Sequence, residues 1–377
     1  MITQLHSKSI AEAAAQQASV NSSARRRGGF TLIEVLIVIA IIGILAGLLI
    51  PAVMFARKTI IQNSMAFEVE ALGNAVEQFR NKYDVYPPDG SNRAAFERAM
   101  RKAFPQIAAT EFTALYSVSN ASNGLPAVLT VMDPSEALVF CLGGFSTSPT
   151  NPFTGPGGPL VAGTSATWQY NVDRTDPLFE FKQDLLSVTV TAGGDTISND
   201  EGVLFGAAGA NDALPVYTPS GMQAPFVYFN SVTYASNVPT PGGGTTRFYN
   251  FYNPSAINGI ARPYKSGEVN TSVTPSTATS VAAQTSNDRH FQYANHRSFQ
   301  LIGAGLDDSY GGVVGASAFE PPVFFSMKTG QSLTFPPSAN PGFVNFIEAQ
   351  SVPSEQLDNV SNFSDGTFES FLATQQP

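Results

Sequence analysis

The feature that most constrains this chain is an apolar run near its N-terminus. Residues 35–56 are 22 consecutive residues without a charged side chain, in a chain of 377 residues whose mean hydropathy is only +0.01. As an α-helix this run would be about 33 Å long, which matches the hydrocarbon thickness of a bilayer. The run therefore predicts one transmembrane helix, which we place at about residues 32–56.

Charge divides the chain on either side of this run. Residues 1–29 carry four basic residues and one acidic residue, so subtracting their +3 from the −9 of the whole chain leaves −12 for residues 30–377. The basic residues 25–27 favour a cytoplasmic N-terminus and a C-terminal part outside the cytoplasm, although Arg57 and Lys58 weaken that asymmetry. The acidic balance argues against a nucleic-acid partner, because neutralising phosphates requires clustered Lys and Arg.

A short motif lies directly before the apolar run. Gly29 is followed by Phe30, and Glu34 is the fifth residue counted from that phenylalanine. Together with Pro51 and a Tyr-Pro-Pro turn at residues 86–88, this stretch resembles the N-terminal region of type IV pilins and type II secretion pseudopilins. The resemblance implies that a prepilin peptidase cuts between Gly29 and Phe30 and methylates the new amine of Phe30.

Glu34 is the charged residue closest to the apolar run on its N-terminal side. A carboxylate at the edge of a membrane span is costly unless it is paired, so Glu34 is a functional candidate. The resemblance implies that Glu34 pairs with the freed N-terminal amine of a neighbouring subunit, which would give register to an assembly. The alternative is that Glu34 only extends to the lipid headgroups.

Three further residues of the apolar run are candidates for assembly. Gly43 and Gly47 have the small-xxx-small spacing that lets helices approach closely, although glycine is also common in such helices by chance. Pro51 has no N–H and its ring clashes with the carbonyl group of Gly47, so we expect the helix to kink or loosen there. The alternative is that Pro51 only ends the membrane part.

Beyond the membrane run, apolar residues continue at helical spacing. They are Met65, Val69, Leu72, Val76, Phe79 and Tyr83. This stripe predicts that one helix covers residues 30–85 and packs the stripe on a sheet. A coiled-coil dimer is the competing interpretation of the stripe. Pro87 and Pro88 end the helix.

Residues 86–377 have the texture of a β-rich head. We expect a short helix at residues 93–104 and a second helix that Asp133 caps, with Pro134 in its first turn. Strands are expected at residues 186–191, 225–234, 246–252 and 297–302. The predicted fold class is α+β and pilin-like: a leader at residues 1–29, the long helix at 30–85, and a head at 86–377 in which an antiparallel sheet carries large insertions.

Few residues of the head point to site chemistry. Asp307 and Asp308 lie in a glycine-rich loop, and their oxygens make them candidate Ca²⁺ ligands, a site that the resemblance also implies; a plain Asp-rich turn is the alternative. Residues 199–202 are a weaker candidate. The spacing of His290 and His296 does not favour metal binding, and the apolar neighbours of Cys141 indicate a core residue. We expect no other cofactor.

These observations favour a structural function rather than an enzymatic one. The resemblance implies a filament subunit of a type II secretion pseudopilus or a type IV pilus, anchored in the inner membrane by one span with its head outside the cytoplasm. Its implied partners are the prepilin peptidase, other pilin-like subunits and an inner-membrane assembly platform. The alternative is a membrane-anchored extracytoplasmic enzyme or binding protein that uses the helix only as a tether.

Overall fold

The computed structural model describes most of the long helix and a large part of the head. The described residues are 31–118, 131–163, 168–198, 214–234, 261, 263–269, 272, 291–310, 323–324, 344–345, 357–364 and 366–374. The chain divides into two compact units, Met1–Arg57 and Lys58–Pro377.

The described elements are short, apart from one helix. The helices are α2 (Leu32–Tyr83), α3 (Arg93–Ala103), α4 (Ala109–Val118), α5 (Pro134–Leu142), the 3₁₀ helix η2 (Gln183–Leu185) and α9 (Phe368–Thr374). The strands are β1 (Leu160–Ala162), β2 (Trp168–Tyr170), β3 (Val188–Val190), β4 (Thr196–Ser198), β5 (Val227–Asn230), β6 (Lys265–Val269), β7 (Phe291–Tyr293), β8 (Phe299–Gly303), β9 (Val323–Phe324), β10 (Val344–Asn345) and β11 (Val360–Ser361).

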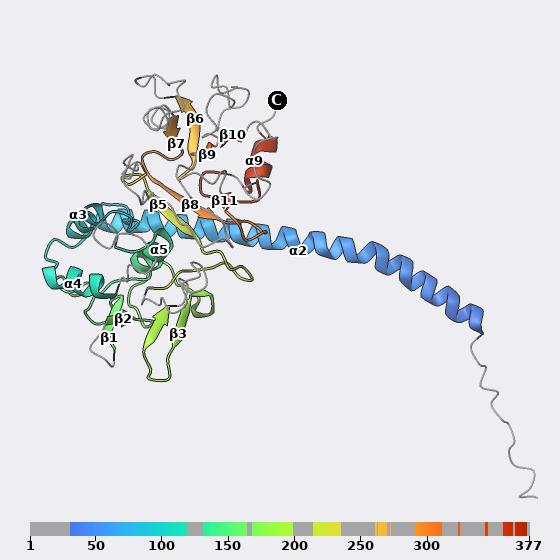
Figure 1. Ribbon diagram of the computed structural model, residues 1–377, viewed down its shortest axis with the longest axis horizontal. Helices are drawn as coiled ribbons and strands as arrows, with labels where there is room; N and C mark the ends of the chain where they lie inside the picture. Colours follow the sequence, from blue (N-terminus) through green and yellow to red (C-terminus); the bar gives the residue numbers. More distant parts are fainter. Residues whose placement is uncertain are drawn as a thin grey trace, which may run out of the picture. The chain divides into compact units, whose positions relative to one another are not determined.

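Helix α2 lies within the range expected from the sequence and is continuous over 52 residues (Figure 1). Pro51 is inside the helix, so it does not end it. The ring of a proline removes one backbone N–H donor, which leaves the carbonyl group of Gly47 without its usual helical partner. A local loosening of the helix at Pro51, and the alternative that Pro51 only ends the membrane part, both stay predictions.

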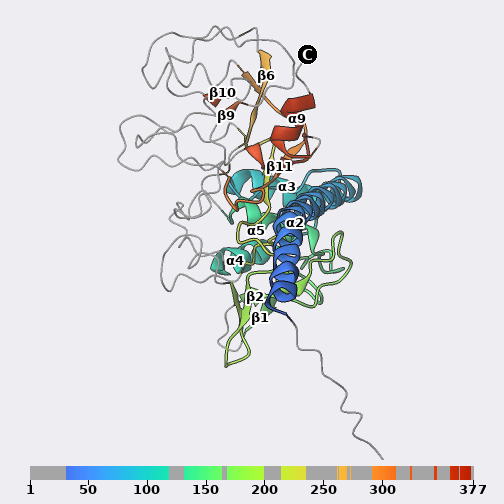
Figure 2. The same cartoon turned by 90° about the vertical axis from the view of Figure 1, so that its right-hand side faces the viewer.

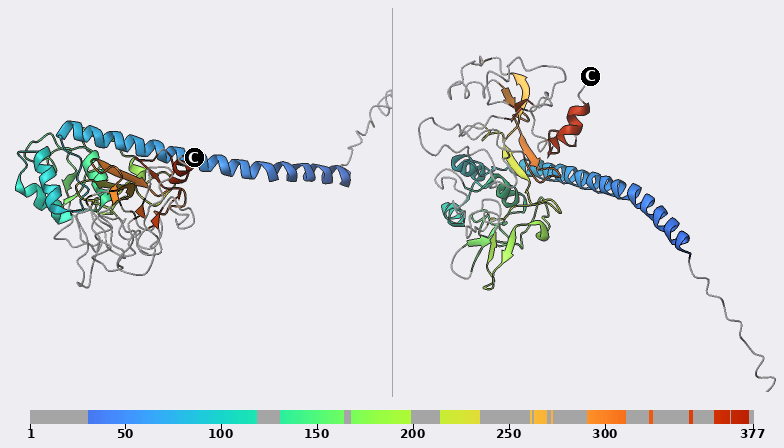
Figure 3. Two further views of the ribbon diagram at one scale, coloured as in Figure 1. Left: turned by 90° about the horizontal axis from the view of Figure 1, so that it is seen from above. Right: turned by 45° about the vertical axis from the view of Figure 1, so that its right-hand side comes forward.

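The head half of α2 buries the predicted apolar stripe in the core of its own chain. Met65, Val69, Leu72, Val76 and Phe79 are each at most 2 % exposed. They pack with residues of a three-stranded antiparallel sheet ordered β11-β8-β5, which lies against this part of α2 in Figure 3. This packing confirms the prediction that the stripe covers a sheet, and the coiled-coil interpretation of the stripe is wrong.

The three-stranded sheet is buried on both faces. In β5, Tyr228 packs into the core beside α2, while Val227 and Phe229 pack into a second core on the opposite face. In β8, Leu301 and Ile302 divide in the same way. Side chains of a strand alternate between faces, so a strand buried on both faces is apolar almost throughout. The second core holds residues from the last part of the chain, including α9.

Two of the short helices begin where the sequence predicts. Asn92 caps α3, because its side-chain oxygen accepts a hydrogen bond of 2.9 Å from the N–H of Ala95. Asp133 and Glu136 form a capping box at the start of α5, where Pro134 occupies the first turn. Helices α3, α4 and α5 gather around the C-terminal end of α2 (Figures 1 and 2).

The remaining strands form three small sheets. Two are antiparallel hairpins, β1-β2 and β3-β4, and the third is a four-stranded sheet ordered β10-β9-β6-β7. The predicted strands at 186–191 and 225–234 contain β3 and β5, and the one at 297–302 overlaps β8, whereas residues 246–252 lie outside the described residues. Strand β9 pairs in parallel with β10 and β6, so the expected α+β fold is present but its sheets are not all antiparallel.

Candidate functional site

The first turn of α2 holds Glu34 through Thr31. One carboxylate oxygen of Glu34 accepts hydrogen bonds from the backbone N–H of Thr31 at 2.7 Å and from its hydroxyl group at 2.8 Å. In return, the Thr31 hydroxyl accepts a bond of 3.2 Å from the N–H of Glu34, and its carbonyl accepts one of 3.3 Å from the N–H of Val35. This reciprocal arrangement is a capping box, which satisfies backbone donors that a helix start otherwise leaves unpaired.

The capping box was missed in the sequence, although its signal is there. Thr31 and Glu34 are three residues apart directly before an apolar run, which is the spacing of such boxes. The hydrogen bonds from Thr31 order the carboxylate of Glu34. Because Glu34 is exposed in the single chain, the carboxylate is still open to a second partner. Gly29 and Phe30, the predicted cleavage and methylation positions, lie outside the described residues.

The membrane half of α2 leaves its apolar side chains unpacked in the single chain. Described residues include one helix long and apolar enough to cross a membrane, by length and composition. Its large apolar side chains between Leu32 and Ile50 are exposed; the exposed fraction is 82 % for Leu32 and 59 % for Ile50. A Cβ atom placed on Gly43 or Gly47 would meet nothing within 4 Å. This surface is thus available to lipid or to another helix, and the assembly role of the two glycines stays a prediction.

The Tyr-Pro-Pro turn after α2 leads into a buried carboxylate. One oxygen of Asp89 accepts hydrogen bonds from the backbone N–H of Ser91 at 3.1 Å and from its hydroxyl group at 2.6 Å. The other oxygen accepts the N–H of Asn230 at 3.0 Å and the hydroxyl group of Thr233. Burial raises the pKa of the Asp89 carboxyl, while these donors act in the opposite direction. Asp89 therefore fixes the turn to the end of β5.

The predicted calcium ligands are engaged with the backbone. The Asp308 carboxylate accepts hydrogen bonds from the N–H groups of Gln223 and Ala224, at 2.7 to 2.9 Å. Asp307 accepts one from the N–H of Ser309 at 2.9 Å. Within the described ranges, no three His, Cys, Asp or Glu side chains come together as a metal site would require. These contacts are those of an Asp-rich turn, and calcium binding stays a prediction.

The other candidates of the head are placed as follows. Cys141 is fully buried, its sulfur lies 3.9 Å from the carbonyl oxygen of Pro88, and burial raises the pKa of its thiol. Its prediction as a core residue is confirmed. His296 is exposed, while His290 and residues 199–202 lie outside the described residues.

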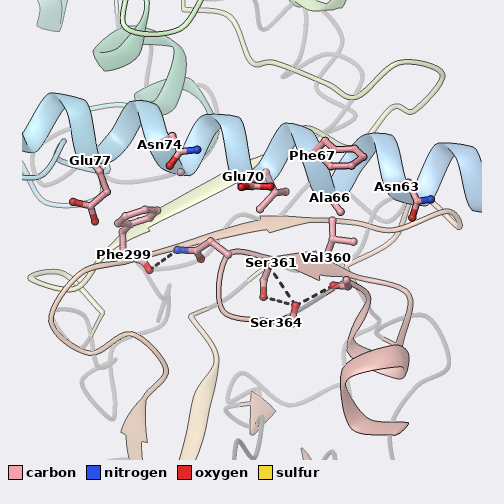
Figure 4. Close-up of a pocket in the computed structure, with 14 residues that line it drawn as sticks. Asn63, Ala66, Phe67, Glu70, Asn74, Glu77, Phe299, Val360, Ser361 and Ser364 are labelled. Carbon is pink, nitrogen blue, oxygen red and sulfur yellow. Dashed lines mark hydrogen bonds between the residues drawn. The ribbon is translucent and has the colours of Figure 1, made fainter. Parts of the chain in front are cut away.

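A groove runs along the head half of α2 (Figure 4). Its volume is about 540 Å³, and it is lined by residues of α2, of β8, of β11 and of the turn that follows β11. Phe67 lies on its α2 wall and is 70 % exposed, while Glu70 and Glu77 add negative charge to the same wall. Phe299 and Val360 line the opposite wall. Phe67 is thus a large apolar side chain that the single chain leaves exposed beside the groove.

Comparison with known proteins supports the resemblance at the N-terminus. Residues 24–50 match the family model of the prokaryotic N-terminal methylation motif. This range contains Gly29, Phe30, Glu34 and both small residues of the glycine pair. No solved structure matches the chain with significance.

Two curated relatives are similar to this chain over 63 residues. The type II secretion system core protein G of Aeromonas hydrophila is 40 % identical there, over 17 % of this chain and 44 % of its own length. The core protein G of Vibrio cholerae serotype O1 is 35 % identical, over 17 % and 43 %. The match thus spans less than half of either relative. The chain carries the prokaryotic N-terminal methylation motif at residues 24–50 and, over 63 residues, is similar to pseudopilins of the type II secretion system, a resemblance that its sequence predicted.

Proposed function

We propose that this chain is a structural subunit of a type II secretion pseudopilus. The observation that carries the proposal is the start of α2: an ordered, exposed carboxylate at Glu34, which lies within the methylation motif and in the first turn of an exposed apolar helix. A filament of such helices needs one directional contact among many apolar ones, and a charged pair supplies it. The similarity to the type II secretion system core protein G supports a place in a secretion system.

Processing would create the partner of Glu34. Cleavage by a prepilin peptidase between Gly29 and Phe30 converts the Phe30 amide nitrogen into an amine, which the peptidase then methylates. The amine is positively charged, so it is the natural partner for a carboxylate that has been removed from water. In the filament, the Glu34 carboxylate would accept a hydrogen bond from the Phe30 amine of the neighbouring subunit. This bond would replace the bonds from Thr31 or be formed in addition to them.

The remainder of α2 would anchor the subunit in the membrane and then contribute to contacts between subunits. Before assembly, α2 anchors the subunit in the inner membrane with the head outside the cytoplasm. An inner-membrane platform then moves it into a polymer with copies of itself or with other pilin-like subunits. Close approach at Gly43 and Gly47, loosening near Pro51 and the groove beside Phe67 would each contribute to contacts between subunits.

This proposal is favoured over a tethered enzyme or binding protein. A tether needs neither a methylation motif nor a carboxylate ordered at the first turn of its helix, and this chain has both. We therefore assign the chain no catalytic activity. A type IV pilus subunit remains the second candidate, because the same motif serves both kinds of filament.

Cell fractionation separates these two candidates. Because a pseudopilus stays within the cell envelope, we expect the processed chain in the envelope fraction and not in fibres sheared from the cell surface. We also expect a deletion strain to retain proteins that the parent strain exports through its type II pathway, and a plasmid copy to restore their export. Sheared extracellular fibres built from this chain, together with normal export in the deletion strain, would identify a surface pilus subunit instead.

A further inference from the structure

Helix α3 is a basic element in an acidic head. Its 11 residues hold four basic residues, Arg93, Arg98, Arg101 and Lys102, against one acidic residue, Glu97. Residues 30–377 as a whole have a net charge of −12. Arg93 is paired with Glu97 at 3.3 Å and the Arg101 guanidinium lies over the ring of Phe112, so Arg98 is the residue of α3 whose charge is open to an acidic partner.

A cavity of about 210 Å³ opens beside α3. One wall is α3 itself, with Ala95, Phe96 and Ala99; the second is the turn that contains Tyr86 and Pro88. The third wall is the end of β5 and the residues that follow it. The lining is therefore mainly apolar and of a size that accepts one apolar side chain rather than a large ligand.

Asp89 holds the three walls together. Asp89 directly follows the Tyr-Pro-Pro turn, and its carboxylate accepts hydrogen bonds from Ser91, which precedes α3, and from Asn230 and Thr233 at the third wall. The Asn230 amide also donates a bond of 2.8 Å to the carbonyl oxygen of Pro87. A cavity whose walls are joined in this way exists before any ligand arrives, which lowers the entropy cost of binding.

The rim of the cavity combines positive charge with exposed apolar surface. Lys102 is paired with Asp84 at 2.8 Å, whereas Arg98 is exposed and has no hydrogen bond or ion pair within the described part of the chain. Val232 lines the cavity and is 70 % exposed. Within the described residues, the rim thus presents the unpaired guanidinium group of Arg98 and the solvent-exposed side chain of Val232.

We propose that this cavity is a docking site for an acidic peptide segment of another protein. One apolar side chain of the segment enters the cavity between α3 and Val232, and a neighbouring carboxylate pairs with Arg98. The guanidinium group suits this role because it binds a carboxylate through two parallel hydrogen bonds. The site goes beyond the proposed filament function and does not depend on it.

The test is peptide binding to the full chain in detergent micelles, measured by fluorescence anisotropy. The probe is a fluorescein-labelled peptide, Gly-Ser-Glu-Phe-Glu-Asp, and its partner probe has Lys at the three acidic positions. We expect saturable binding of the acidic probe only. Arg98→Glu should weaken it about tenfold, since it replaces an attraction by a repulsion, and Val232→Asp should weaken it similarly.

Lys182→Glu is the matched control, because Lys182 is exposed, lies outside α3 and undergoes the same change of charge. We expect it to change the dissociation constant by less than about twofold. Absence of saturable binding, equal binding of the Lys probe, or equal losses in the Arg98 and Lys182 variants would overturn the proposal. A second copy of the chain is the other possible occupant. If sedimentation showed that Arg98→Glu abolishes self-association, and the acidic probe did not compete with that self-association, the second copy would be the occupant and the proposal would be overturned. Peptide binding by a chain that forms no filaments would contradict only the proposed function.

Discussion

Glu34→Val is expected to leave the chain processed and inserted in the membrane but unable to form filaments. The substitution removes the carboxylate that would pair with the Phe30 amine of the next subunit. Leaving one partner of a desolvated pair without the other costs about 3–5 kcal/mol per contact. Because a filament repeats that contact at every subunit, we expect filament yield to fall below detection in electron micrographs and in cross-linking ladders.

A second substitution separates the two roles that the structure gives to Glu34. Glutamine at the same position of a capping box still accepts the hydrogen bonds from Thr31, so Glu34→Gln keeps the helix start. It removes the negative charge and therefore the pair with the amine. We expect Glu34→Gln to assemble nearly as poorly as Glu34→Val, while Glu180→Val, at an exposed glutamate of the head, assembles normally.

The opposite pattern would identify Glu34 as a cap alone. If Glu34→Gln filaments formed at the parental yield and Glu34→Val filaments did not, the hydrogen bonds to Thr31 would be the essential feature. Normal filaments from both variants would remove Glu34 from the assembly mechanism altogether.

Arg174→Met is expected to destabilise the head strongly. The Arg174 guanidinium donates hydrogen bonds to the carbonyl oxygens of Val139 at 3.0 Å, of Phe140 at 2.6 Å and of Gly144 at 3.1 Å. These carbonyls lie in or just after the last turns of α5, where a helix leaves backbone acceptors short of partners; of the three, the Val139 carbonyl also accepts a bond of 3.1 Å from the N–H of Gly143. Burial of the guanidinium lowers its pKa, so its charge is kept by these carbonyl dipoles rather than by water.

Methionine preserves much of the aliphatic stem but offers no donor to those carbonyls. Allowing for the partial exposure of Arg174, we expect unfolding free energy to fall by about 3 kcal/mol. Urea titration followed by the fluorescence of Trp168, the one tryptophan of the chain, measures it. Lys182→Met loses the same charge at an exposed position and should change stability by less than about 0.5 kcal/mol. Equal effects of the two variants would show that Arg174 contributes only surface charge.

Local signals in the sequence predicted the elements whose cause is local. The spacing of apolar residues from Met65 to Phe79 predicted the buried face of α2. Asp133 and Pro134 predicted the start of α5, because a capping side chain acts on a backbone group only two or three residues away. The apolar run predicted the membrane helix by length alone.

The rest depends on contacts between residues far apart in the sequence. Arg174 donates hydrogen bonds to carbonyl groups near the end of α5, more than 30 residues earlier in the chain. No rule of sequence spacing predicts that contact. Asp89 reaches Asn230 and Thr233 across more than 140 residues. The carboxylates of Asp307 and Asp308 suggested metal binding from composition, but whether a carboxylate meets a cation or a backbone N–H is decided by the fold around it.

The measurement that tests the central claim most directly is the intact mass and N-terminal sequence of the chain purified from membranes. We expect a chain that begins at Phe30 and carries one methyl group on its amine. The Gly29→Asp variant should retain residues 1–29 without methylation, because the peptidase needs a small residue before the bond that it cuts. A wild-type chain that keeps residues 1–29, or one cleaved after residue 56, would contradict a processed filament subunit.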